Sequence, residues 1–123
     1  MIVKDVIEYV QSNIPFKYYA NEFPKNENKD CGIVRIEGGS APSVYIDGMK
    51  TPSIQIIVRH ESGNEAERIS KTIWDLFHNK SHYSIGNTKV YFTSCEQSEP
   101  IYLSKDNNGR TLYSINVACK IYD

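Results

Sequence analysis

Cysteine is scarce in this chain of 123 residues, and its three cysteines stand far apart, at Cys31, Cys95 and Cys119. Disulfides form between pairs of cysteines in oxidising compartments, and structural zinc sites usually draw on closely spaced cysteines. An odd and dispersed set therefore predicts neither a disulfide framework nor a zinc site. We expect no metal ion and no other cofactor.

Long apolar runs and an excess of one charge are also missing. A transmembrane helix needs about 20 largely apolar residues, and no segment of the sequence approaches that length. At the N-terminus the apolar residues are interrupted by Lys4, Asp5 and Glu8, which argues against a signal peptide. Fourteen Lys and Arg residues against 15 Asp and Glu residues give a net charge of −1. No basic stripe therefore indicates a dedicated nucleic-acid binder. We expect folding in a cytoplasm, away from membranes.

The overall composition is typical of one globular domain over residues 1–123, with 40% hydrophobic and 24% charged residues. Nine tyrosines outnumber four phenylalanines. Tyrosine is favoured in β-strands, and its amphipathic ring is also favoured at protein–protein contacts. Composition leaves both interpretations of the tyrosines open.

Two segments have the apolar spacing of amphipathic helices. The first spans about residues 2–14 and ends before Pro15, because the residue before a proline avoids helical geometry. The second spans about residues 65–78, with Trp74 at the edge of its apolar stripe. Asn64 is placed to cap this second helix in a variant of the capping box.

Alternating apolar residues predict strands at 33–37, 53–60 and 89–95, followed by a β-hairpin within residues 100–122. Asn108-Gly109 predicts a type I′ turn in that hairpin. The polar residues 20–31 and the glycine- and proline-rich residues 38–52 predict loops. Within the second loop, residues 43–47 form either a strand edge or an extended loop arm.

This order of elements predicts an α+β domain. We expect a mainly antiparallel β-sheet with two helices packed on one face, a projecting loop and a C-terminal β-hairpin. The long loop is of interest because structureless loops of this length in small domains are usually functional or disordered.

Two groups of polar residues have the residue types of reactive sites. His60, Glu61 and Ser62 are adjacent, but consecutive strand residues point to opposite faces, so adjacency alone does not build a catalytic relay. His78 and His82 have the spacing of a helical metal pair, but the residues between them are typical of a helix exit. We expect no enzyme. A small enzyme or ligand-binding domain that uses His60 and Glu61 is the rival hypothesis.

The remaining features are typical of an assembly subunit: a long exposed loop, a projecting hairpin and abundant tyrosine. Candidate contact residues for a second copy or a partner lie on the loop, at a strand end, on the second helix and at the hairpin tip. They are Tyr45, Asp47, Arg59, His60, Glu61, Trp74, Lys105, Asp106 and Arg110. A solvated turn that discourages edge pairing explains the last three equally well.

The sequence contains three stretches with a distinctive order and spacing: "PSIQIIVRHES", "NEAERISKTIWDLFH" and "PIYLSKDNNGRTLYSINV". Their common features are a strand that ends in Val58-Arg59, a helix pattern at residues 73–77 and a hairpin that turns at residues 106–110. Together with the loop "GGSAPSVYIDG", they resemble the minor capsid and tail-terminator family of tailed bacteriophages. The resemblance covers about residues 32–123 and, more loosely, the first helix.

The resemblance implies a tail terminator, also called a tail completion or tail-to-head joining protein. Such proteins form a hexameric ring on the end of the tail tube, stop its polymerisation and offer the head connector a docking surface. DNA passes through the lumen. The implied partners are other copies of this chain, the major tail tube protein and the head–tail connector or stopper protein of the virion. The family has no catalytic residues to carry over. Another neck component, such as a head-completion or stopper protein, is the alternative.

Overall fold

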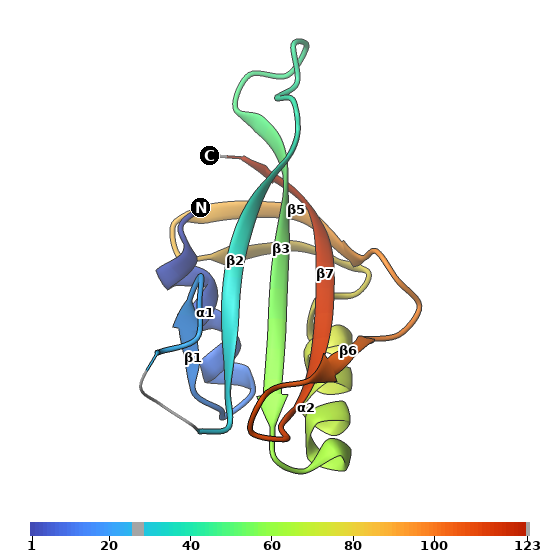
Figure 1. The fold of residues 1–123 in the computed structure, drawn as a ribbon. Helices are drawn as coiled ribbons and strands as arrows, with labels where there is room; N and C mark the ends of the chain where they lie inside the picture. Colours follow the sequence, from blue (N-terminus) through green and yellow to red (C-terminus); the bar gives the residue numbers. More distant parts are fainter. Residues whose placement is uncertain (26–28, 123) are drawn as a thin grey trace.

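Two helices and a mainly antiparallel seven-stranded sheet make up the computed structural model, which describes residues 1–25 and 29–122 (Figure 1). The helices are α1 (Val3–Asn13) and α2 (Gly63–Phe77). The strands in chain order are β1 (Tyr18–Ala20), β2 (Cys31–Ser40), β3 (Met49–His60), β4 (Lys80–Ile85), β5 (Thr88–Cys95), β6 (Ile101–Lys105) and β7 (Thr111–Tyr122). This arrangement confirms the predicted α+β class.

The strands lie in the order β1-β2-β3-β7-β5-β4, and β6 pairs with β7 outside this path. The described pairs are antiparallel except for β1 with β2, which is parallel. One edge of β7 pairs with β3. Its other edge is shared, because β6 pairs with residues 111–114 and β5 with residues 117–122. Between β5 and β6 the chain leaves the sheet, and we call residues 96–100 the excursion loop.

Both helices cover one face of the sheet, as predicted. Alternate residues of β3 point to that face, and Ile54, Ile56 and Val58 are fully buried there. Fully buried side chains of both helices belong to the same core; they are Val6, Val10, Ile73 and Phe77. The apolar stripes of the two amphipathic segments therefore explain where the helices pack.

The start of α2 differs from the prediction. The helix begins at Gly63, and Ser62 is its N-cap, because the Ser62 hydroxyl accepts a hydrogen bond from the backbone N–H of Glu65 at 3.3 Å. Asn64 lies inside the first turn, so the prediction that Asn64 caps the helix is wrong. The chain has the serine–x–x–glutamate pattern of a capping box two residues earlier than predicted.

The C-terminal hairpin of β6 and β7 is confirmed, but its turn is not type I′. Gly109 has a positive φ of 78°, whereas Asn108 does not lie in the positive region. The Asp106 carboxylate accepts hydrogen bonds from the backbone N–H groups of Asn108 and Arg110, each at 2.9 Å. Backbone pairing of Asp106 with Arg110 leaves a three-residue loop whose left-handed position needs the glycine.

Neither edge strand, β1 or β4, is predicted from the sequence. Tyr18 of β1 is 3% exposed and lies against Gly32, where any added Cβ would meet the tyrosine ring. β4 forms a tight hairpin with β5 through Gly86, whose φ is +58°. Strands also take both ends of the loop predicted for residues 20–31. Residues 26–28 of that loop lie outside the described residues.

The connection between β2 and β3 projects beyond the rest of the sheet (Figure 1). We call residues 38–52 the arm and residues 43–47 the arm tip. The two strands extend into the predicted loop and leave residues 41–48 between them. The arm tip consists of bends and turns, so it is a loop arm and not a strand edge. Pro52 lies where the β3–β7 register passes from Lys50 to Ser53, a position that tolerates a missing N–H.

Candidate functional site

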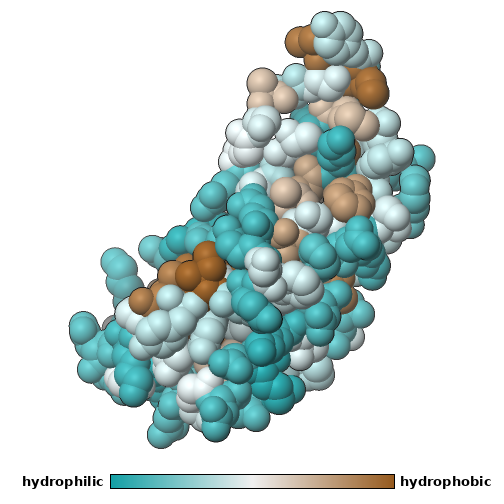
Figure 2. All heavy atoms as spheres, turned by 90° about the vertical axis from the view of Figure 1, so that its right-hand side faces the viewer, coloured by the Kyte–Doolittle hydropathy of each residue, from teal (hydrophilic) through white to brown (hydrophobic). Residues whose placement is uncertain are grey.

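Three consecutive apolar residues stand at the arm tip with little cover. Val44 is 88%, Tyr45 94% and Ile46 46% exposed, and Figure 2 shows hydrophobic residues at the far end of the arm. The Ser43 hydroxyl accepts hydrogen bonds from the backbone N–H groups of Tyr45 at 3.2 Å and Ile46 at 3.0 Å, so the tip has a defined turn. Contiguous exposed apolar residues usually mark a surface that a partner covers.

Charged residues gather where β3 ends and the β6–β7 hairpin turns. The Asp30 carboxylate is at the centre, because its Oδ1 accepts hydrogen bonds from the Glu61 backbone N–H at 2.8 Å and from Arg110 Nε at 3.1 Å. Its Oδ2 lies 3.5 Å from His60 Nε2. We call this group the ionic end; its members are Asp30, Arg59, His60, Glu61, Asp106 and Arg110. It joins segments that are far apart in the sequence.

Arg59 is the most buried member of the ionic end, with 8% exposure. Its guanidinium donates to the Lys29 carbonyl from Nη2 at 2.9 Å and from Nε at 3.2 Å. It also lies 4.3 Å from the centre of the Phe23 ring and, through Nε, 4.0 Å from Asp106 Oδ2. Arg59 therefore ties the segment before β2 to the hairpin turn.

The adjacent His60, Glu61 and Ser62 do not form a catalytic relay in the structure. His60 Nδ1 accepts a hydrogen bond from the Ser62 backbone N–H at 2.9 Å, while the Ser62 hydroxyl accepts from Glu65. The serine hydroxyl is thus used in capping α2. Among the described residues, no group of three or more His, Cys, Asp or Glu side chains is placed to hold a metal ion.

Two of the buried thiols, those of Cys95 and Cys119, are in environments that disfavour a nucleophilic thiolate. Burial raises the pKa of Cys95 and of Cys119 to about 12 in each case. The thiolate is the reactive form of cysteine, so both groups stay protonated and unreactive near neutral pH. All three cysteines, including Cys31, are buried, and none of them forms a disulfide.

The two histidines with helical spacing lie on different elements. His78 caps the end of α2, where its Nδ1 accepts from the Cys95 backbone N–H at 3.2 Å, whereas His82 belongs to β4. The His78 ring stacks on Trp74 with 4.2 Å between centroids. Trp74 Nε1 donates to the Gln97 carbonyl at 2.9 Å. Trp74 therefore packs within its own chain and holds the excursion loop.

The structure brings some of the predicted contact residues together and separates others. Five of them share the ionic end; they are Arg59, His60, Glu61, Asp106 and Arg110. Tyr45 and Asp47 lie on the arm tip, Trp74 lies on α2, and Lys105 is exposed at the end of β6. A contact role for these residues stays a prediction. Sequence reasoning missed Asp30, because no local pattern marks it. It also missed Val44 and Ile46 beside Tyr45, although a run of three apolar residues between polar ones would have indicated them.

The comparison with protein families decides the class of this molecule. The family model for bacteriophage tail terminator proteins matches residues 5–123. The chain belongs to this family. A solved structure has a similar fold, with a TM-score of 0.56 at 12% identity, and the match covers 98% of this chain and 91% of that chain. At that identity the likeness concerns the fold alone. The curated proteins give no match.

Membership of the tail terminator family confirms the resemblance inferred from the sequence and makes the chain a structural component of the phage tail, and so of the virion. Two of the stretches that carried the resemblance meet in space, because Val58-Arg59 and residues 106–110 adjoin at the ionic end. In the part of the chain that the structure describes, no helix is long and apolar enough to cross a membrane.

Proposed function

We propose that this tail terminator assembles as a hexameric ring on the end of the tail tube, stops the polymerisation of the tube and joins the tail to the head. The observation that carries the proposal, besides the family, is the arm tip. Val44 and Tyr45 are almost fully exposed at the end of a long projection, and apolar residues in this position gain free energy when a partner removes them from water.

The two ends of the molecule differ in a way that suits a closed ring. A head-to-tail ring requires two different, complementary surfaces on each subunit and a rotation that closes. The arm tip is apolar and projecting, whereas the ionic end is charged and fixed within the sheet. The molecule therefore does not present the same surface at both ends of the sheet.

The proposed partners are other copies of the chain, the major tail tube protein and the head–tail connector or stopper protein. DNA passes through the lumen of the ring without specific binding. A net charge of −1 supports this part of the proposal, because affinity for phosphates grows with the number of basic contacts. Assembly takes place in the host cytoplasm.

The test uses phage particles made without this protein. We expect tails of uncontrolled length and unjoined heads, and we expect added purified protein to restore joining. Electron microscopy of tails with bound protein should show a six-fold ring at the end next to the head. Purified tail tube protein polymerised with and without the terminator gives a second measurement, the distribution of tube lengths.

Two results would contradict the proposal in different ways. A protein that binds the head connector but leaves tube length unchanged would instead be a head-completion or stopper protein. A protein that stays monomeric in the presence of tail tubes and never binds their ends would refute the ring model. An unrelated protein of similar size serves as the control for non-specific effects on tube length.

A further inference from the structure

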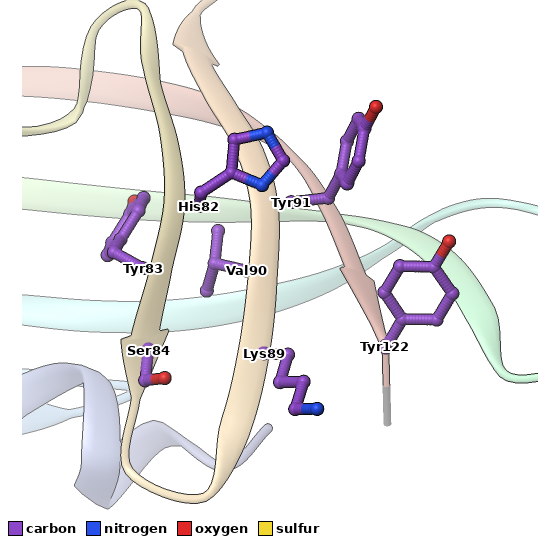
Figure 3. Close-up of a pocket in the computed structure, with 7 residues that line it drawn as sticks. All are labelled: His82, Tyr83, Ser84, Lys89, Val90, Tyr91 and Tyr122. Atoms are coloured by element: carbon purple, nitrogen blue, oxygen red, sulfur yellow. The ribbon is translucent and has the colours of Figure 1, made fainter.

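A second exposed aromatic surface lies on the sheet, apart from the arm tip. It is a shallow hollow of about 330 Å³ beside the β4–β5 hairpin, lined by His82, Tyr83, Ser84, Lys89, Val90, Tyr91 and Tyr122. Figure 3 shows the rings of His82, Tyr91 and Tyr122 standing on the adjacent strands β4, β5 and β7. Tyr91 is 45% and Tyr122 36% exposed. We call this surface the aromatic hollow.

Two irregularities of the backbone meet in the aromatic hollow. His82 has a φ of +56°, which is uncommon for a residue with a side chain. Tyr91 is the extra residue at the shift of the β5–β7 register between Val90 and Phe92, so it occupies a β-bulge. Bulges redirect side chains and are frequent near functional sites. Here the His82 ring packs edge-on against Tyr91, with 4.9 Å between centroids.

The aromatic hollow and the arm tip are complementary. The hollow offers aromatic surface with the exposed cation Lys89 at its edge, and the tip offers Val44 and Tyr45 followed by the exposed anion Asp47. Apolar contact supplies affinity, while opposite charges favour one orientation of the partners. The arm carries the tip away from the sheet (Figure 1), so the two surfaces are separate parts of one subunit.

We propose that the arm tip of one copy of this chain docks in the aromatic hollow of the next copy, with Asp47 facing Lys89. This rests on the proposed ring and names the contact that links its subunits. A contact between two different surfaces is heterologous, so it can be repeated from copy to copy until the ring closes. Tyr45 is the anchor, because tyrosine residues that fill a partner's hollow often carry much of the binding energy.

A charge-reversal cycle tests the proposal on terminator-deficient tails. Asp47→Lys and Lys89→Asp should each weaken occupancy of the tail ends at least about tenfold, and the double variant should recover most of the loss. Lys17→Asp is the matched control, because Lys17 is also exposed but precedes β1, far from the hollow in the sheet. It should leave occupancy unchanged. A double variant as weak as the weaker single variant would overturn the pairing.

Photo-crosslinking identifies the occupant directly. A photoreactive phenylalanine analogue at position 45 should crosslink to residues 80–91 or 120–122 of a second copy, as mapped by mass spectrometry. Crosslinks to the tube protein, or to another part of the chain, would overturn the docking while rings on tails would still support the proposed function. Crosslinks at the hollow without binding to tail ends would support the docking and refute the proposed function.

Discussion

Removal of the Asp30 carboxylate should destabilise the fold, because it removes contacts within the ionic end. Asp30→Ala deletes the acceptor for the Glu61 backbone N–H at 2.8 Å and for Arg110 Nε at 3.1 Å, and it also removes the anion 3.5 Å from His60. Those donors then depend on water or on weaker partners. The substitution thus removes the side chain that connects the loop before β2 with the end of β3 and with the hairpin turn.

The magnitude follows from the geometry and the exposure. A hydrogen bond to a charged group contributes about 1.5–3 kcal/mol when buried. The Asp30 side chain is 30% exposed and that of Arg110 13%, so solvent screening reduces each contribution. We expect Asp30→Ala to lower the free energy of unfolding by about 2 kcal/mol. Asp30→Asn keeps an acceptor oxygen but loses the charge, and we expect a loss of about 1 kcal/mol.

Urea unfolding measures these differences. With a slope near 2 kcal/mol per molar urea, Asp30→Ala should lower the midpoint by about 1 M. Asp47→Ala is the control, since it removes an exposed acidic residue from the arm tip, and such substitutions usually change stability by under about 0.5 kcal/mol. Equal midpoints for Asp30→Ala and Asp47→Ala would refute the view that the ionic end stabilises the fold.

Four further substitutions test the local structure. Ser62→Ala should cost about 1 kcal/mol in urea unfolding because it removes the N-cap, whereas Asn64→Ala should cost less than about 0.5 kcal/mol; the reverse order would place the cap at Asn64. Gly86→Ala should cost more than about 1 kcal/mol, since φ is +58° and the new Cβ would lie 2.5 Å from the Asp5 carboxyl carbon; an unchanged thermal midpoint would contradict this turn. Phe77→Ala should cost about 3–5 kcal/mol because the ring is fully buried, and calorimetry of a variant with nearly unchanged stability would argue against this core.

The elements with a long apolar period were predictable from the sequence. α2 has five buried residues at helical spacing, and β7 alternates buried with more exposed residues from Ile115 to Tyr122, so packing against one core explains both patterns. β7 lies in the antiparallel centre of the sheet, between β3 and β5. The agreement of both elements with the α+β prediction therefore reflects burial, which the period of apolar residues encodes directly.

The edge strands were not predictable from apolar alternation, because their burial is set by the rest of the fold. In β4 only Ile85 is fully buried, so polar residues dominate the segment. The glycine at position 86, followed by asparagine, was the available turn signal. β1 has three residues and lies parallel to β2, a pairing that depends on Tyr18 meeting Gly32 in space.

The ionic end illustrates why contact networks escape sequence reasoning. Asp30 meets Glu61 across 31 positions and Arg110 across 80 positions of the chain. The β3–β7 register, which pairs His60 with Thr111, creates this proximity. Polar residues in a loop do not recur at a regular spacing, so the sequence gives no sign of such partners. The hairpin turn also depends on a side chain. The Asp106 carboxylate accepts hydrogen bonds from the backbone of the turn and so stabilises a three-residue loop in place of the predicted type I′ turn.

The architecture separates the residues that stabilise the fold from those available for assembly. The part of the arm between β2 and β3, residues 41–48, is a loop that lies outside the sheet and beyond the pair of Met49 with Tyr122. The arm therefore adds little to the core, and its exposed Tyr45 gains free energy only from a partner. A substitution at the arm tip should change assembly without unfolding the domain, whereas a substitution at Asp30 should change both. Arm-tip variants are for this reason the cleaner probes of function.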